Sequence, residues 1–428
     1  MAMANTSNRE IFERRESVVR SYCRGLDAVL VTAQGSMVRD TEGRQYIDFL
    51  AGAGALNYGH NDPDMKQALL QYIGSDGIAH GLDLHTNAKR AFLETFEDLI
   101  LVPRRMDHRV QFTGPTGANA VEAALKLARK ATGRTNVIAF TRGFHGLSQG
   151  ALAATANTRM RGGPVIPLSG VSRLPFDGYL GPGVDTADVL ASMLADPSSG
   201  VDAPAAILLE TVQGEGGLNA ASPRWLRRVA ALAAEHGALL IIDDIQAGCG
   251  RTGTFFSFET AGVVPDIVVL SKSLSGFGLP MSVVLVKPGT DVWRPGEHTG
   301  TFRGNGHAFV TAGVALRKFW SDSEFAKDVA RRADLVARRL AEIADGISGA
   351  KVKGRGMLQG IELAAPLTAL IRRTCIRNGL IIESSGPHDE VLKVLPPLTT
   401  PDHLLDQGLE MLAEATGAAI RSPLEVSA

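Results

Sequence analysis

Two charged residues at the ends of neighbouring apolar runs are the most chemically informative feature of the chain. The run Ala238–Ile242 ends in Asp243, and the run Ile267–Leu270 is followed by Ser271 and Lys272. Both runs have the length and composition of buried strands, and a charged group at the end of a buried strand costs free energy unless a partner compensates it. We therefore expect Asp243 and Lys272 to face a shared ligand.

Pyridoxal phosphate (PLP) is a cofactor that needs both groups. A lysine amine forms a Schiff base with its aldehyde, and a carboxylate keeps its pyridine nitrogen protonated, so that the ring can accept electrons. The ordinary alternatives are a solvated lysine at a strand end and an aspartate that caps a loop. Because Asp243 and Asp244 directly follow five apolar residues, the second alternative is weaker than usual here.

The composition restricts the classes of partner. The 428 residues suit one large domain plus a smaller one. A net charge of −1 gives no electrostatic case for nucleic acid or a membrane surface, and no apolar stretch reaches membrane-spanning length. The N-terminus lacks the apolar region of a signal peptide, and three widely spaced cysteines favour reduced thiols. We expect a cytoplasmic protein with small-molecule partners, no nucleic acid, no membrane and no metal.

Alternating strand and helix patterns between residues 108 and 287 predict an α/β domain with a mostly parallel sheet. A charged helix over Asn8–Tyr22 and a hairpin-like stretch precede it, and a long helix over Ser323–Asp345 and several short apolar runs follow it. We expect an N-terminal segment, 1–60, that joins the small domain, a large domain over 61–320, and a small α+β domain over 321–428.

Further polar groups lie where predicted strands end and helices begin, which is where α/β sheets place their sites. A turn before the helix around Val121–Arg129 offers a hydroxyl and backbone N–H groups to an anion. An aromatic residue after a strand could stack on a flat ring. Taken singly, each has an ordinary structural interpretation. These candidates are Thr116, Gly117, Ala118, Phe144, His145, Glu210, Glu215, Ile245, Gln246, Thr301 and Arg303.

Four motifs together identify a family. They are TGANAVEAALKLAR at 116–129, ETVQGEGG at 210–217, DDIQAGCGRTG at 243–253 and PDIVVLSKSLSGFGLP at 265–280. The chain resembles the class-III PLP-dependent aminotransferases over roughly residues 20–420. The resemblance implies PLP-dependent transferase fold type I, with a mostly parallel seven-stranded sheet in the large domain, and a homodimer or higher homo-oligomer with shared active sites.

Within the class, FLAGAGALNYGHN at 49–61, PFDGYLG at 175–181 and GEHTGTFRGN at 296–305 are similar to the aminotransferases of diaminobutyrate and 2-oxoglutarate, including those of ectoine biosynthesis. That resemblance implies transfer of the terminal amine between L-2,4-diaminobutyrate and 2-oxoglutarate, giving aspartate 4-semialdehyde and glutamate. Alternatives are another ω-aminotransferase acting on ornithine, acetylornithine, lysine or 4-aminobutyrate, an aminomutase or racemase, and a non-catalytic PLP-fold binding protein.

The resemblance also implies a role for each candidate residue. Lys272 is the Schiff-base lysine and general base, and Asp243 is the partner of the pyridine nitrogen. The other residues implied to bind the cofactor are Gln246 at the ring hydroxyl, Phe144 and Ile245 on the two ring faces, Thr116, Gly117, Ala118 and the neighbouring subunit's Thr301 at the phosphate, and His145 and Glu210. Glu210 and Glu215 would also shape the substrate side.

The substrate side departs from the family pattern at two positions. Many members carry arginine where this chain has Lys393, in the pattern before Pro396 and Pro397, and glycine where it has Arg303. Lysine keeps the charge but cannot form the bidentate contact of a guanidinium with a carboxylate. Glu215, Arg303 and Lys393 are therefore the predicted substrate-binding residues, and Arg303 is the candidate for the carboxylate clamp.

Overall fold

Seven short strands, most of them apolar at every position, form the central sheet of the computed structural model, which describes residues 9–163 and 167–421. The strand order is β4-β12-β11-β10-β7-β5-β6. All neighbours pair in parallel except β12, which runs antiparallel to β11 and β4. The strands are β4 (Arg109–Phe112), β5 (Val137–Phe140), β6 (Val171–Leu174), β7 (Ala206–Leu209), β10 (Leu239–Asp243), β11 (Ile267–Leu270) and β12 (Val283–Val286). The predicted mostly parallel seven-stranded sheet is confirmed.

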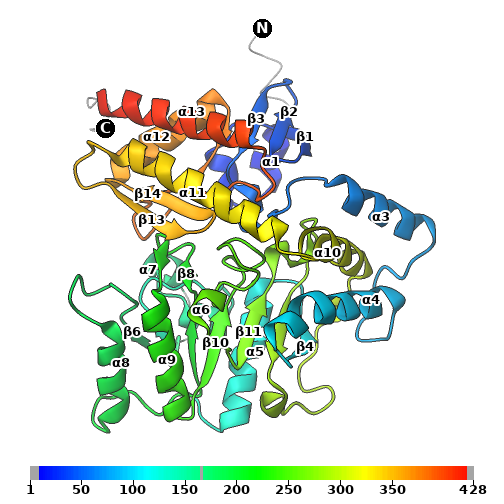
Figure 1. Ribbon diagram of the computed structural model, residues 1–428, viewed down its shortest axis with the longest axis vertical. Coiled ribbons are helices and arrows are strands. Elements are labelled where there is room, and N and C mark those ends of the chain that lie inside the picture. Colours follow the sequence, from blue (N-terminus) through cyan, green and yellow to red (C-terminus); the bar gives the residue numbers. More distant parts are fainter. Residues whose placement is uncertain (1–8, 164–166, 422–428) are drawn as a thin grey trace.

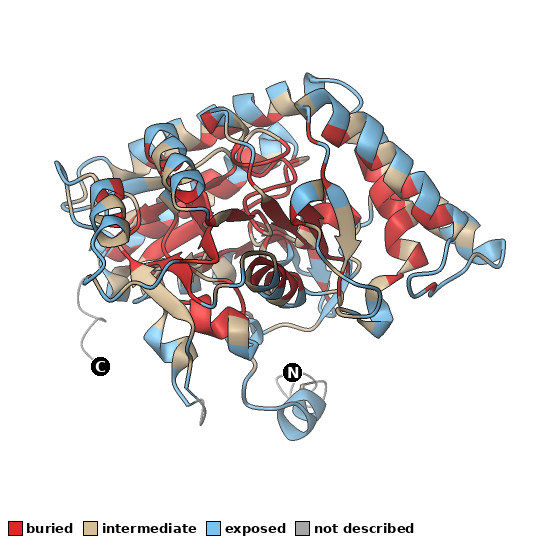
Figure 2. Ribbon diagram, turned by 90° about the horizontal axis from the view of Figure 1, so that it is seen from below, coloured by how far each residue is buried: buried red, intermediate tan, exposed pale blue. Residues whose placement is uncertain are grey.

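Helices cover both faces of this sheet, as its continuous apolar strands require. On one face, alternate strand residues such as Ile241 and Val269 pack against α5. On the other face, residues such as Ile242 and Val268 pack against α4, α9 and α10. Figure 2 shows buried residues gathered in the interior and exposed residues on the outer sides of the helices. The helices of this part are α3 (Pro63–Gly74), α4 (Asn87–Phe96), α5 (Gly117–Thr132), α6 (Gln149–Ala154), α7 (Thr158–Arg161), α8 (Thr186–Ala195), α9 (Pro223–Glu235) and α10 (Gly306–Phe319).

A second, smaller part contains two four-stranded sheets and three helices, drawn above the large sheet in Figure 1. The strand order is β13-β14-β17-β16 in one sheet and β1-β2-β3-β15 in the other, so N-terminal and C-terminal strands share a sheet. Its elements are β1 (Leu30–Gln34), β2 (Met37–Asp40), β3 (Gln45–Asp48), α11 (Glu324–Ala344), β13 (Lys351–Arg355), β14 (Leu358–Glu362), α12 (Ala365–Asn378), β15 (Leu380–Ile381), β16 (Glu383–Ser385), β17 (Val391–Val394) and α13 (Asp402–Arg421). The short hairpin β8 (Val212–Gln213) and β9 (Asn219–Ala220) lies beside the large sheet.

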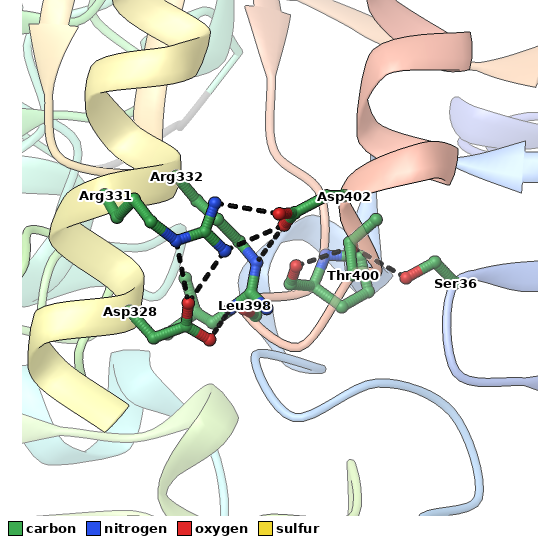
Figure 3. Close-up of polar contacts among 8 residues, drawn as sticks. Ser36, Asp328, Arg331, Arg332, Leu398, Thr400 and Asp402 are labelled. Atoms are coloured by element: carbon green, nitrogen blue, oxygen red, sulfur yellow. Dashed lines mark hydrogen bonds and ion pairs between the residues drawn. The ribbon is translucent and has the colours of Figure 1, made fainter. Parts of the chain in front are cut away.

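The turn that follows β17 is held in place from both sides (Figure 3). On one side Arg332 of α11 donates to the Leu398 carbonyl at 3.1 Å and pairs with Asp402 at 3.2 Å. On the other side the hydroxyls of Ser36 and Thr400 lie 2.7 Å apart. These contacts fix the segment that follows β17, the strand that carries Lys393 as its last but one residue.

A buried guanidinium joins the two parts of the molecule. Arg251 has no exposed surface, and no carboxylate of the described residues lies within ion-pair distance of it. It donates to the Asn57 side chain at 2.6 and 3.1 Å and to the backbone carbonyls of Met357 and Pro396 at 3.2 and 2.6 Å. Burial lowers the pKa of Arg251 to about 9. Four hydrogen bonds to neutral acceptors thus hold the small part against the large one.

The predicted helix over Asn8–Tyr22 is wrong in its length, and Asn8 itself lies outside the described residues. Helix α1 covers only Glu10–Arg15, and none of its residues is buried. Val18 and Val19 are among the most exposed apolar side chains, so nothing packs on a longer helix there. A short helix without a buried face is marginal in water.

Among the described residues, no helix has the length and apolar character needed to span a membrane.

Candidate functional site

The four central parallel strands deliver the predicted residues to one edge of the large sheet. β5, β7, β10 and β11 are parallel neighbours, and their carboxyl ends therefore meet. Asp243 is the last residue of β10, and the segments that follow the other three strands contain Phe144 and His145, Glu210, and Lys272. A cavity of about 240 Å³ opens there, and its lining residues are Gly117, Ala118, Phe144, His145, Gly146, Leu147, Glu210, Glu215, Asp243, Ile245, Gln246 and Lys272.

Lys272 enters this cavity from a strained backbone position. It follows β11 at the start of the short helical turn η5 (Lys272–Ser275), with φ of 48°. A non-glycine residue in the left-handed region costs of order 1–3 kcal/mol, and such strain collects at functional sites. Its Nζ donates to the Ala53 carbonyl at 2.8 Å, and burial lowers the pKa of Lys272. A lowered pKa makes the amine a better nucleophile and base near neutral pH.

Asp243 is held by an ion pair with His145. The His145 Nδ1 donates to Asp243 Oδ2 at 2.8 Å, and both side chains are almost completely buried. Burial lowers the pKa of His145, but the hydrogen bond and charge of Asp243, with the charge of Glu210, outweigh it and raise the pKa overall. Among the described residues, the other Asp243 oxygen accepts only the Ile245 N–H, at 3.2 Å. Asp243 therefore has a fixed orientation and an oxygen with spare acceptor capacity.

Glu210 is fixed by the backbone of two neighbouring loops. Its carboxylate accepts the Phe144 N–H at 2.9 Å and the Gly214 N–H at 3.2 Å. Burial raises the pKa of Glu210, and the charge of Asp243 raises it further. Glu210 thus connects the loop that carries Phe144 to the cavity, beside His145 and Asp243.

The predicted anion-binding turn is built as a cradle without room for larger side chains. α5 begins at Gly117, and the Oγ1 of its N-cap, Thr116, accepts the Asn119 N–H at 3.3 Å. A Cβ added to Gly117 would lie 2.7 Å from the Ile245 side chain, and one added to Gly146 would lie 2.7 Å from that of Ala118. Gly117 and Ala118, the first two residues of this 16-residue helix, both line the cavity, and the start of a helix is a favourable place for an anion.

Gln246 and Ile245 also lie where the sequence places them. Gln246 donates from Nε2 to the Ala53 carbonyl at 3.0 Å and to Glu215 at 3.3 Å. Its Oε1 is buried and has no hydrogen-bond partner among the described residues. A buried amide oxygen without a partner can accept a hydrogen bond from a polar substituent of a bound ring. Ile245 and Phe144 both line the cavity and are half-buried.

A charged cluster closes the side of the site that belongs to the small part. The Nζ of Lys393, which has no exposed surface, lies 2.9 Å from Glu215 and 2.6 Å from Glu383. The positive charge of Lys393 lowers the pKa of Glu215 against the opposing effect of burial. Both carboxylates in turn raise the pKa of Lys393, which stays protonated. Tyr22, on the turn Tyr22–Arg24, is 59% exposed, but partial loss of hydration around its hydroxyl and the charges of Glu383 and Glu215 raise its pKa to about 12.

Thr301 and Arg303 lie outside the cavity of their own chain. Both belong to the short turn η7 (Thr301–Arg303), which follows a glycine packed against the backbone of Gly114. Arg303 forms an ion pair with Asp83 and donates to the His298 carbonyl at 3.4 Å. The predicted phosphate and substrate contacts of this turn stay predictions, which require a second copy of the chain.

Sequence reasoning missed Tyr22, Glu383 and the carbonyl of Ala53 as parts of the site. Glu383 stands directly opposite Lys393 in the antiparallel pair β16–β17. Nothing in a single sequence fixes the register of these two short strands. Ala53 belongs to a left-handed turn, with φ of 56°, which alanine rarely adopts.

The residues present fit PLP. The cavity combines an amine of lowered pKa, an oriented buried carboxylate, an amide oxygen without a hydrogen-bond partner and a helix N-terminus in a glycine-lined cradle. These are the groups that an aldehyde, a pyridine nitrogen, a ring hydroxyl and a phosphate would each require.

Comparisons with known proteins agree with this chemistry. A family model described as "Aminotransferase class-III" matches residues 21–416. Diaminobutyrate–2-oxoglutarate transaminases of Bordetella parapertussis and Halomonas elongata are each 53% identical to the chain, over 96% of it and 95% and 99% of their own lengths.

Solved structures of the same family share the fold. An ornithine aminotransferase of Toxoplasma gondii superposes with a TM-score of 0.82 at 25% identity, covering 98% of this chain and 96% of its own. An N-acetylornithine aminotransferase of Stenotrophomonas maltophilia does so with a TM-score of 0.76 at 31% identity, covering 97% and 100%. The fold is therefore that of the PLP-dependent aminotransferases, and the cofactor is pyridoxal phosphate. The chain belongs to the class-III aminotransferase family.

Proposed function

We propose that the protein transfers the terminal amine between L-2,4-diaminobutyrate and 2-oxoglutarate, with aspartate 4-semialdehyde and glutamate on the other side of the reaction. What supports this substrate pair most is the 53% identity, over 96% of the chain, with proteins named for that reaction. The complete set of Lys272, Asp243, His145 and Gln246 around one cavity supports an active enzyme over a non-catalytic binding protein.

Each residue has a defined task in the proposed mechanism. PLP, when bound, accepts the electrons released as a C–H bond of the substrate breaks. Asp243, oriented by His145, holds the proton of the pyridine nitrogen. Lys272 would hold the cofactor between turnovers, and as a free amine it would take the proton from the amine-bearing carbon and return it to the former aldehyde carbon of the cofactor. The Ala53 carbonyl, 2.8 Å from Nζ, orients that amine.

The role of Lys272 has a direct test. Lys272→Ala should lose both the visible absorbance of the covalently bound cofactor and turnover, while its unfolding transition is kept. Borohydride reduction followed by peptide mass spectrometry should find the cofactor on Lys272 in the unmodified protein. Cofactor trapped on another lysine in the variant would contradict the assignment.

An amino-donor panel with 2-oxoglutarate, read as glutamate formed, tests the substrate assignment. Diaminobutyrate should give the highest kcat/KM. Ornithine and N-acetylornithine belong in the panel because the solved structures above carry those names. A higher kcat/KM for either would replace the proposed donor, and turnover of one amino acid without any keto acid would indicate a mutase or racemase.

We also propose that the functional unit is a homodimer in which each site takes residues from both chains, and that the protein is cytoplasmic. Exposed apolar side chains gather from the end of α3 to the start of α4 and on η7, and they are Leu70, Ile73, Ile78, Leu82, Leu84 and Phe302. A second copy would bury them and could bring Thr301 and Arg303 to the neighbouring cavity. Three free thiols support a reducing compartment.

A further inference from the structure

Lys393 is the single ammonium group between two carboxylates at the substrate side of the site. Glu215 and Glu383 lie 2.9 and 2.6 Å from its Nζ, and the exposed fractions of the three side chains are 24%, 10% and 0% for Glu215, Glu383 and Lys393. With both carboxylates ionised, the cluster carries a net charge of −1. Lys393 alone cannot neutralise both partners, and Lys272, whose charge also lowers the pKa of both carboxyl groups, is the residue that would bind the cofactor.

The second carboxylate belongs to the architecture of the small part. Glu383 and Lys393 are directly opposed in the antiparallel pair β16–β17, so the register holds the pair together. Glu215 comes from the other side, from the loop after β8, and Gln246 also donates to it. If Glu215 moves, Lys393 stays neutralised by Glu383.

This negative charge favours the binding of one proposed substrate and disfavours the binding of the other. Diaminobutyrate retains an ammonium group and a carboxylate when its terminal amine reacts, so a negative cluster favours it. 2-Oxoglutarate carries two carboxylates and no ammonium group, so the same cluster repels it. A charge inside a protein acts over several ångströms with much less screening than in water.

We propose that Glu383 sets the charge of the site for its two substrates: it is ionised when the diamino donor binds, and it takes up a proton when the dicarboxylate acceptor binds. The inference rests on the proposed function, since it needs one substrate with a spare ammonium group and another with two carboxylates. The carboxylate clamp, Lys393 or Arg303, does not affect it, because either cation would act in the field of Glu383.

The surroundings of Glu383 suit such a role. Burial raises its pKa, the charge of Glu215 raises it further, and Lys393 and Lys272 lower it. The groups that face it are Lys393 on β17, Glu215 after β8, Lys272 on η5 and Tyr22 on the N-terminal turn. Helix α12, packed against β16, contributes Arg372, which donates to Ser384 instead. A dicarboxylate nearby adds negative charge, which raises the pKa of a carboxyl group again.

Calorimetry with glutarate, a five-carbon dicarboxylate without a keto group, tests the proposal. Titration of the cofactor-loaded protein at a series of pH values, in two buffers of different ionisation heat, counts the protons taken up on binding. The wild type should take up protons as glutarate binds, and where it does so its affinity should fall as the pH rises, by at most ~tenfold per pH unit. Glu383→Gln should take up none, bind glutarate roughly tenfold more tightly, and raise KM for the diamino donor.

The neighbouring strand supplies a matched control. Glu362 on β14 pairs with Lys353 at 2.9 Å in the same sheet, away from Lys393. Glu362→Gln should keep the proton uptake of the wild type. Glu383→Asp, which keeps a carboxyl group, should keep it as well.

Several outcomes would overturn the proposal. One is a wild type that takes up no proton at any pH of the series, a measurement that needs no variant to fold. Another is a Glu383→Gln protein that still takes up the proton, or that changes glutarate and donor binding in the same direction. If diaminobutyrate fails in the donor panel while glutarate binding still takes up a proton through Glu383, the donor assignment is wrong and the role of Glu383 stands.

Discussion

The proposed role of Asp243 depends on the negative charge of its carboxylate, which a substitution of similar size can remove. Asp243→Asn keeps the size of the side chain and removes the charge that holds the pyridine proton. We expect cofactor binding to persist and kcat to fall at least a hundredfold, about 2.7 kcal/mol of barrier. Single-turnover absorbance changes with cofactor-saturated protein would measure this loss. Asp266→Asn, before β11 at the other edge of the sheet, is the control, and near-normal kcat in Asp243→Asn would contradict the assignment.

His145 should give the folded protein a recognisable pH dependence. Because Asp243 raises the pKa of His145 above its unfolded value of about 6.5, the bound proton favours folding. This stabilisation is complete below pH 6.5 and is lost as the pH rises through the folded pKa. The excess unfolding free energy of wild type over His145→Gln, from denaturant titrations, should therefore shrink between neutral and alkaline pH.

A second buried histidine provides the opposite case. Burial lowers the pKa of His108, which contacts the Pro265 carbonyl at 2.9 Å. Its neutral form favours folding, so its contribution is present above pH 6.5 and is lost as the pH falls. His108→Gln should thus change the pH profile in the opposite direction to His145→Gln. Parallel profiles for the two variants would show that the His145–Asp243 ion pair does not control this pH dependence.

Residue types and their positions along the chain were sufficient to predict Lys272, Asp243 and their neighbours. Each lies where an apolar strand ends, and parallel strands bring their ends to one edge. The same reasoning did not find Glu383, because its importance comes from the register of two short strands. Nor did it find Tyr22, which was predicted as the last residue of the N-terminal helix and instead begins the turn Tyr22–Arg24.

At the scale of elements, the N-terminus of α5 requires a residue without a side chain at Gly117. A methyl group at Gly117 would meet the Ile245 side chain at 2.7 Å. We expect Gly117→Ala to push Ile245 into the cavity and to raise the dissociation constant of the cofactor by roughly tenfold or more, with little change in the unfolding transition. Equilibrium dialysis of PLP would measure the effect.

Helix α3 contains a matched control for this substitution. Gly74, near the end of that helix, has no atom within 4 Å of its added Cβ. Gly74→Ala should leave cofactor affinity unchanged. Equal PLP affinity in Gly117→Ala and wild type would contradict a phosphate cradle at the N-terminus of α5.

The elements that sequence patterns missed are those with mixed composition. β6, Val171–Leu174, has two polar residues between two apolar ones and forms one edge of the large sheet, where only its last residue is buried. The pairing of β15 with β3 joins residues more than 300 positions apart. Only tertiary contact defines such a pair, so local periodicity cannot predict it.

At the scale of the whole molecule, the arrangement of Thr301 makes sharing of sites between two copies testable. Thr301 is exposed and lies outside the cavity of its own chain. If its loop reaches the phosphate end of a neighbouring cavity, Thr301→Asp should weaken cofactor binding by charge repulsion, and Lys272→Ala should abolish turnover outright.

Mixing these two inactive variants then distinguishes shared from separate sites. A heterodimer of Lys272→Ala with Thr301→Asp has one cavity with both lesions and one cavity with neither. Random exchange makes half of the dimers mixed, so about a quarter of wild-type activity should return after mild denaturation and refolding together. The control is Lys272→Ala mixed with the double variant, which places a lesion in every cavity and should regain nothing. If the first mixture recovers no activity although the protein sediments as a dimer, each chain completes its own site. A fully active monomer would contradict the proposal that the functional unit is a dimer.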